Sequence, residues 1–103
     1  MSVTLRIIQE YDIRHEREFM ALERQFAELE RTHADFPKGR RRRPLAATEP
    51  CNTLIWECEF PDLDAAYKTL DFFKGNDRHE ELYAKQLPYF VKTRIEFLEN
   101  LDF

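Results

Sequence analysis

His79 and Trp56 are the two residues of this 103-residue chain whose chemistry could serve a catalytic site, although the sequence alone assigns no catalytic residue. An imidazole titrates near neutral pH, so His79 could act as a general base or ligate a haem iron. The other interpretation of His79 is an exposed or capping residue of a helix. Trp56 offers a large flat ring with one N–H donor, and such residues more often fill a core than contact a ligand.

Four consecutive arginines form a second feature that could do chemistry, because clustered positive charge attracts anions. The run consists of Arg40, Arg41, Arg42 and Arg43. With Lys38 it carries five positive charges in a chain whose net charge is −4. Nucleic-acid binding is not expected, since Glu57 and Glu59 would repel phosphates and their segment lacks the glycine of RNA-recognition motifs. The alternatives are an edge strand kept soluble by charge and arginines that bridge to a partner's carboxylates.

Composition and spacing exclude several other classes of protein. Hydrophobic residues make up 43% of the chain and aromatic residues 14%, so it can bury a core and is not disordered. Cys51 and Cys58 fit neither a disulfide framework nor a zinc site, and they indicate a reducing, cytoplasmic setting without a metal. No apolar run approaches the ~18 residues of a membrane span, and the N-terminus lacks a signal peptide. We expect one domain over residues 1–103.

Alternation of apolar and polar residues predicts three strands, since successive side chains of a strand point to opposite faces. They span residues 3–11, 53–60 and 93–101. Segment 40–47 is expected to be an edge strand, because it combines arginines with Pro44, which cannot donate a hydrogen bond to a sheet.

Apolar residues that recur at intervals of three and four predict the helices. The first helix covers residues 14–32, with Asp12 as its N-cap. A second helix begins at Asp62, and Gly75 is expected in the left-handed conformation that follows a helix end. A third helix begins at a capping box opened by Asp77.

The order β-α-β-β-α-β predicts an α+β, ferredoxin-like domain, a four-stranded antiparallel sheet with its helices on one face. The face toward the helices is expected to carry Val3, Leu5, Ile7, Leu54, Trp56, Phe60, Ile95 and Phe97. The other face mixes isoleucines with charges, namely Arg6, Ile8, Glu10, Ile55, Glu57, Glu59, Arg94, Glu96 and Leu98. A single subunit would then expose Ile8, Ile55 and Leu98, and exposed apolar patches usually mark a contact.

One segment carries a resemblance to a known family. Residues 52–63 read Asn-Thr-Leu-Ile-Trp-Glu-Cys-Glu-Phe-Pro-Asp-Leu, and Leu70 and Asn76-Asp77 follow ahead of a tyrosine-bearing helix. The chain here resembles the C-terminal half of NIPSNAP-like domains, and the likeness extends over residues 52–101. It implies a dimeric α/β barrel, a homodimer in which two ferredoxin-like subunits pack sheet against sheet. It also implies a pocket between sheet and helices for a small apolar or aromatic ligand, with the candidates Gln9, Trp56, Tyr67 and Tyr83.

The resemblance leaves two functions open. One is the binding of a small molecule without a cofactor. The alternative is a monooxygenase that is cofactor-independent or degrades haem, because some proteins of this superfamily do such chemistry with an Asn, a Trp and a His. Trp56 and His79 would supply two of these residues, whereas the first strand offers Gln9 in place of the Asn. Haem is expected only under this alternative.

Overall fold

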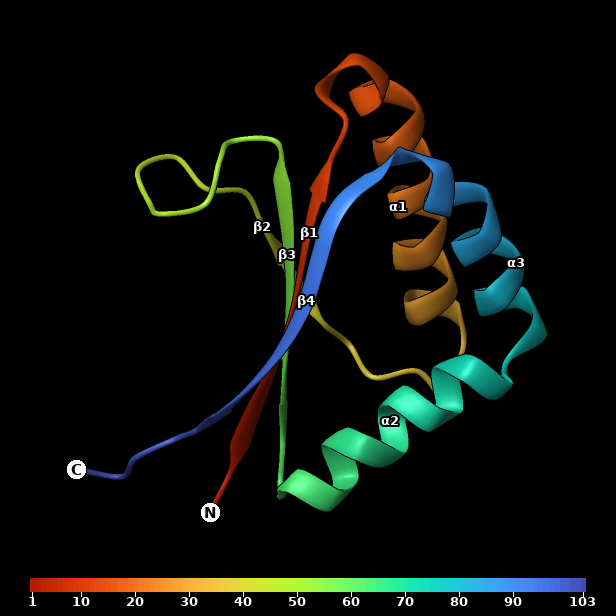
Figure 1. Ribbon diagram of the computed structural model, residues 1–103. Coiled ribbons are helices and arrows are strands. Elements are labelled where there is room, and N and C mark those ends of the chain that lie inside the picture. The colour runs from red at the N-terminus through yellow and green to blue at the C-terminus, as the bar shows by residue number, and fades with distance from the viewer.

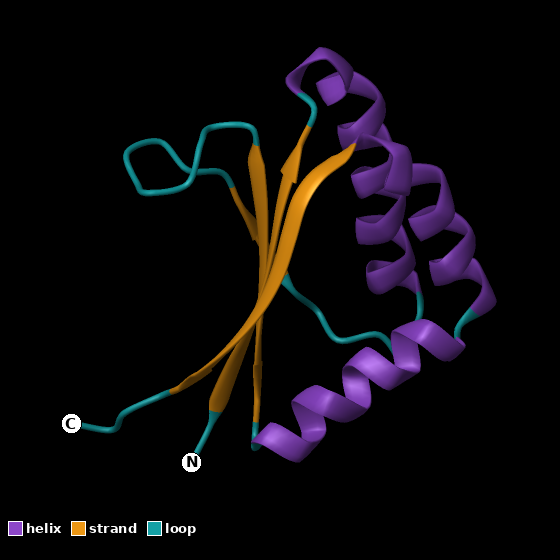
Figure 2. Ribbon diagram, viewed as in Figure 1, coloured by secondary structure: helices purple, strands orange, loops and turns teal.

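Helices cover one face of a four-stranded antiparallel sheet in the computed structural model, which describes residues 1–103 (Figure 1, Figure 2). The strands are β1 (Val3–Tyr11), β2 (Arg40–Arg42), β3 (Thr53–Phe60) and β4 (Phe90–Glu99), in the sheet order β2-β3-β1-β4. The helices are α1 (Glu16–Thr32), α2 (Leu63–Gly75) and α3 (Asp77–Gln86), with short 3-10 turns η1 (Ile13–His15) and η2 (Leu87–Tyr89). The predicted ferredoxin-like α+β fold is confirmed.

The apolar core lies between the inner face of the sheet and the helices. In the central strand β1, Ile7 lies opposite Trp56 of β3 and Ile95 of β4, so all three share the inner face. The main cluster of buried side chains consists of Leu5, Phe26, Leu29, Phe36, Trp56, Phe60, Ala66, Phe73 and Leu82. This packing confirms the predicted inner face. Ile95 lies on that face but is 49% exposed, because it borders the cavity described below.

Two aspartates begin helical segments as the sequence predicts. Asp62 accepts a hydrogen bond from the backbone N–H of Ala65 at 2.8 Å and thereby caps α2. Asp12 accepts from the N–H of Arg14 at 3.0 Å, but it caps the 3-10 turn η1, and α1 itself begins at Glu16. None of the helices combines the length and the apolar character that spanning a bilayer requires.

The junction between α2 and α3 differs from the sequence prediction. Gly75 is the last residue of α2, and its φ is not positive, so the predicted left-handed residue is wrong. Asn76, one residue before the predicted Asp77, caps α3, and its Oδ1 accepts from the N–H of His79 at 2.9 Å. Because Asn76 also ends α2, the two helices follow each other without a longer loop, and His79 is fixed in the first turn of α3.

Two strands have other bounds than the sequence predicts. β2 ends at Arg42 rather than at residue 47, and Pro44 lies just beyond it, where its missing N–H cannot extend the ladder. β4 begins at Phe90, three residues earlier than predicted, because the 3-10 turn containing Pro88 leads directly into it.

The outer face of the sheet, opposite the helices, is partly covered by the loop of residues 43–52 (Figure 1). Ile8 and Ile55 are only 3% and 7% exposed, so the prediction that a single subunit exposes these isoleucines is wrong. Glu49 of this loop pairs with Arg94 on β4, and Ile8 lies between Ile55 and Arg94 in the strand register. A loop that starts beside β3 and reaches Arg94 must pass over both isoleucines.

Candidate functional site

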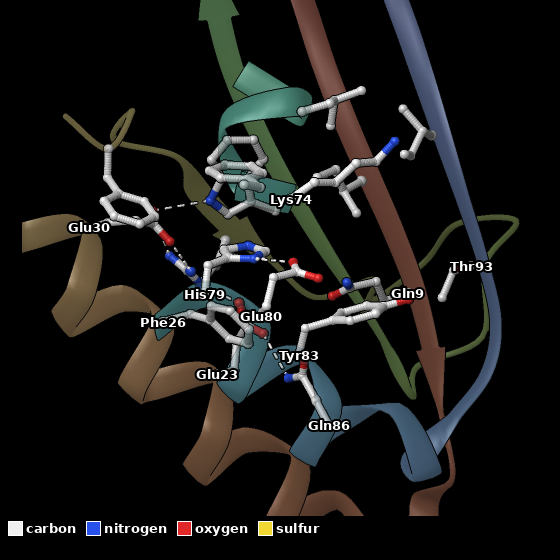
Figure 3. Close-up of a pocket in the computed structure, with 17 residues that line it drawn as sticks. Gln9, Glu23, Phe26, Glu30, Lys74, His79, Glu80, Tyr83, Gln86 and Thr93 are labelled. Carbon is white, nitrogen blue, oxygen red and sulfur yellow. Dashed lines mark hydrogen bonds and ion pairs between the residues drawn. The ribbon is translucent and has the colours of Figure 1, made fainter. Parts of the chain in front are cut away.

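A cavity of about 400 Å³ lies between the inner face of the sheet and the helices. Its apolar lining includes the aromatic rings of Phe26, Phe36, Trp56, Phe73 and Tyr83. His79 and Tyr83 reach into it from α3, and Gln9 of β1 and Thr93 of β4 face them from the sheet (Figure 3). Apolar walls with a few converging polar groups are the usual form of a small-molecule site.

Trp56 is both a core residue and a wall of this cavity. It is 5% exposed, and its ring meets Phe73 edge-on at a centroid distance of 6.0 Å. Its Nε1–H donates to Oε1 of Glu30 at 3.2 Å, so the buried donor is satisfied. The backbone N–H of Gly39 donates to the same oxygen at 3.3 Å. Trp56 therefore fills the core, and its ring also borders the cavity, where it could contact a ligand.

Two buried carboxylates from α1, those of Glu23 and Glu30, line the cavity seven residues apart. Arg41 of β2 joins them: its Nε donates to Oε2 of Glu23 at 2.7 Å, its Nη1 donates to Oε1 of Glu30 at 3.3 Å, and its Nη2 pairs with Oε2 of Glu30. Nε2 of Gln86 donates to the remaining oxygen of Glu23 at 2.9 Å. Every carboxylate oxygen thus has a donor, which a buried charge requires.

The alternation of strand β2 explains why Arg41 points inward. Arg41 lies opposite Trp56 in the register, so it shares the inner face with that residue. Burial by itself would lower the pKa of Arg41, but its bonds to Glu30 and Glu23 outweigh burial and raise the pKa. One guanidinium therefore stays charged between two carboxylates.

His79 is packed among aromatic rings, which favours its uncharged form. Its imidazole stacks on Phe73 with a centroid distance of 4.5 Å and an interplanar angle of 3°, and it meets Phe26 at 5.0 Å. Nδ1 lies 3.3 Å from Oε1 of Glu80, whereas Nε2 has no hydrogen-bond partner. Burial lowers the pKa of His79, although the contact with Glu80 acts in the opposite direction. The site thus holds an uncharged imidazole with one nitrogen anchored and one free, which is the arrangement of a general base.

The lining of the cavity does not fit haem well. His79 is the single imidazole that could ligate an iron. Two propionates would need cations, but Arg41 is already bound by two carboxylates, which leaves Lys74 alone. In addition, no group of three or more His, Cys, Asp and Glu side chains is placed to hold a metal ion.

Four of the sequence-predicted site residues come together at the cavity, namely Gln9, Trp56, His79 and Tyr83. Tyr67 does not join them. Its ring packs against Phe97 at 4.7 Å, on the inner face but outside the cavity, and it is about half exposed.

The four arginines do not form one anion-binding patch, because they belong to a strand and its end and point in alternating directions. Arg41 points inward to the buried carboxylates. Arg42 pairs with Glu57 at 3.3 Å, and Arg43 pairs with Glu16 at 2.9 Å. The run is therefore neutralised largely by carboxylates of its own chain, and only its first member makes no ion pair.

The residues of the site that sequence reasoning did not identify include Glu23, Glu30, Glu80, Gln86 and Thr93. A signal was present for two of them: Glu23 follows Phe19 by four residues and Glu30 follows Phe26 by four, so both lie on the apolar stripe of α1. Two acidic residues on a buried stripe require a buried cation. Arg41 is that cation, because it lies at an inward-pointing position of β2. Only the strand register shows that Arg41 meets the two glutamates.

Comparisons with solved structures identify proteins that have the same fold. No protein-family model and no curated protein matches the sequence. A NIPSNAP family protein from Agrobacterium tumefaciens superposes with a TM-score of 0.79 at 13% identity, covering 99% of this chain and 88% of that one. A NIPSNAP-like domain protein from Burkholderia xenovorans gives 0.75 at 18%, covering 99% and 87%. An antibiotic biosynthesis monooxygenase gives 0.72 at 10%, covering 97% and 99%.

These similarities confirm the resemblance to NIPSNAP-like domains at the level of the fold. They extend over nearly the whole of this chain, whereas the sequence motif covered only its second half. Proteins with unrelated activities share such scaffolds, so function has to be argued from the cavity itself.

Proposed function

We propose that this protein binds a small aromatic ligand in the cavity between the sheet and the helices. The observation that carries the proposal is the cavity itself, about 400 Å³ of space with five aromatic side chains in its lining. This volume lies in the range of ~300–1,000 Å³ that is typical of small-molecule sites. Phe73 and Trp56 would contact the faces and edges of a flat ligand, and Gln9 and Thr93 would offer hydrogen bonds from the sheet.

The protein contains its own probe for this proposal, since Trp56 is its single tryptophan and lines the cavity. Titration with neutral aromatic compounds such as biphenylmethanol is expected to change the fluorescence of Trp56, and calorimetry supplies an independent affinity. Tyr83→Ala should weaken binding, because Tyr83 lines the cavity. Tyr67→Ala is the matched control, since Tyr67 is similarly exposed but lies outside. No binding at about 1 mM ligand, or equal effects of the two variants, would contradict the proposal.

The state of His79 favours a second candidate function, oxidation of an activated aromatic substrate by O₂ without a cofactor. The free Nε2 of the neutral imidazole would take a proton from an acidic CH₂ or phenolic group, while Glu80 holds Nδ1. Electrons would then pass from the substrate anion to O₂. In the full reaction of a CH₂ group, one oxygen atom ends in a new C=O bond and the other leaves as water with both hydrogens. A quinol instead loses two electrons and two protons to O₂, which gives a quinone and hydrogen peroxide.

Oxygen uptake by the purified protein with a quinol or an anthrone-like substrate tests this second candidate. His79→Ala should abolish the uptake, whereas His15→Ala should not, because His15 lies on the 3-10 turn η1 away from the cavity. Equal rates in the two variants, or no uptake by the unmodified protein, would remove the oxidation and leave ligand binding alone.

We also propose that two copies of the chain associate through the outer faces of their sheets. No helix covers this face (Figure 2), although the loop of residues 43–52 covers part of it. Its charges alternate across the strands, since Arg6 of β1 lies between Glu57 of β3 and Glu96 of β4. Arg6 pairs with Glu57 at 3.2 Å and with Glu96 at 3.5 Å. Such a pattern is self-complementary under a two-fold axis. Leu98 adds apolar surface at 43% exposure, which a second copy would bury.

The two thiols, Cys51 and Cys58, are both free. Free thiols are the usual state in a reducing compartment, and they support a cytoplasmic location for this protein.

A further inference from the structure

The floor of the cavity carries more negative than positive charge. Glu23 and Glu30 are 6% and 8% exposed, and they share Arg41 as their single cation. Gln86 and Trp56 complete their hydrogen bonds, but these donors are uncharged. The floor of the cavity, formed by Glu23, Glu30 and Arg41, thus has two carboxylates and one guanidinium and carries one net negative charge. In a poorly solvated site such a charge acts on a ligand more strongly than it would in water.

A third carboxylate adds to this imbalance at the centre of the cavity (Figure 3). Glu80 uses Oε1 to hold Nδ1 of His79, and its Oε2 has no partner. His79 is half-buried, and burial lowers its pKa and so favours the uncharged imidazole, which does not balance Glu80. Lys74 is the other cation of the lining, but it is exposed and makes no ion pair. The ionisable groups around the cavity therefore carry one net negative charge. Glu23 and Glu30 are buried, whereas the side chain of Glu80 is 45% exposed.

The aromatic rings that line the cavity also favour a positively charged ligand. Phe26, Phe73, Trp56 and Tyr83 line the cavity, and the faces of such rings attract cations. Rings without the carboxylates would accept any apolar molecule, and the carboxylates without the rings would be an ordinary ion-pair cluster. Both features occur together in the lining of this cavity.

We propose that the cavity selects aromatic ligands that carry a positively charged ammonium group over neutral and anionic ligands of the same shape. This inference rests on the proposed ligand-binding function and adds the chemical class of the ligand. The ring of the ligand would lie among the aromatic walls. Its ammonium group would lie near Glu80 and the pair formed by Glu23 and Glu30, where its charge offsets the excess of carboxylates.

A matched series of biphenylmethylamine, biphenylmethanol and biphenylcarboxylate tests the inference, because the three compounds differ mainly in charge at neutral pH. Fluorescence of Trp56 and calorimetry give the three affinities. The amine is expected to bind about tenfold more tightly than the alcohol, the combined effect of a cation–π contact and a partly buried ion pair. The carboxylate is expected to bind more weakly than the alcohol.

Glu23→Gln removes one negative charge from the floor and should reduce the preference for the amine to about twofold or less. The alcohol serves as the reference in each variant, so the ratio of affinities does not depend on a modest loss of stability. Glu28→Gln is the matched control, because this substitution removes the same charge from the exposed side of α1, where Glu28 pairs with Arg31. The preference should persist in this control.

The outcomes separate the two proposals. If none of the three compounds binds, the proposed ligand-binding function fails and the inference falls with it. If the alcohol or the carboxylate binds as tightly as the amine, ligand binding stands and the charge selection is wrong. If the amine is preferred equally in Glu23→Gln and Glu28→Gln, the preference arises from the overall charge of the protein, and the assignment to the cavity is overturned.

Discussion

The backbone of Gly39 lies directly against the indole ring of Trp56, so that a Cβ atom built on Gly39 would lie 1.9 Å from Cε2 of the ring. The N–H of Gly39 and the Nε1–H of Trp56 donate to the same oxygen of Glu30. This glycine is required for close approach rather than for an unusual backbone angle, since its φ is not positive. Gly39 therefore allows the chain to enter β2 in direct contact with the indole ring that forms one wall of the cavity.

Gly39→Ala is therefore expected to lower the free energy of unfolding by about 1–3 kcal/mol, because the added methyl group displaces the indole ring. Urea denaturation followed by circular dichroism measures the change. Gly75→Ala is the control, since nothing lies within 4 Å of its Cβ position and the residue is helical, and it should be neutral or stabilising. Equal effects of the two substitutions would show that Gly39 does not touch the ring.

Trp56→Ala is expected to cost about 3–5 kcal/mol of stability, as the truncation of a large buried aromatic residue does. Trp56 is 5% exposed and belongs to the main core cluster. Trp56→Phe should cost less, because it retains most of the ring while removing one of the donors to Glu30. An unchanged denaturation midpoint for Trp56→Ala would mean that the ring is exposed.

Arg41→Met is expected to destabilise the protein by about 3–5 kcal/mol at neutral pH, because it leaves two buried carboxylates without their cation. Arg40→Met changes the same charge at a residue without an ion pair, and it should stay within about 0.5 kcal/mol of the unmodified protein. Similar losses in both variants would contradict the role of Arg41.

The lowered pKa of His79 predicts that the protein loses stability as the pH falls below 6.5. Burial holds its pKa in the folded protein below the ordinary value of 6.5, so below that pH the unfolded chain binds more protons than the folded one. The stability that neutral His79 contributes is present above pH 6.5 and is lost as the pH falls through the folded pKa. His79→Phe, which keeps a ring in the stack, should remove this part of the dependence. Thermal unfolding of both proteins over this range measures it, and identical pH profiles would contradict it.

The outer face of the sheet gives a test of association. Light scattering of the unmodified protein at tens of micromolar should give about twice the chain mass of 12.5 kDa. Leu98→Asp should shift the protein toward the monomer, because Leu98 is exposed on this face and a charge there would be buried by a second copy. Leu63→Asp is the control, since Leu63 is 42% exposed but lies on α2, in the helical layer on the other side of the sheet. A monomeric unmodified protein would contradict the association.

Sequence periodicity determined the order of strands and helices and the inner face of the sheet. Alternation along residues 3–11 and 53–60 fixed which side chains point inward, so the pattern alone assigned Gln9 and Trp56 to one surface. Spacing along the second half of the chain placed His79 in the first turn of a helix. These features are local, because each depends on residues that are near one another in the chain.

Only the tertiary structure decided which charges meet and what covers the outer face. Glu23 and Arg41 are eighteen residues apart, and their contact depends on where α1 lies on the sheet and on the register of β2. Ile8 and Ile55 are buried because the loop of residues 43–52 reaches Arg94, which no local pattern specifies. Contacts of this kind arise from the packing of separate elements, and a periodic pattern fixes the face of an element but not its neighbour.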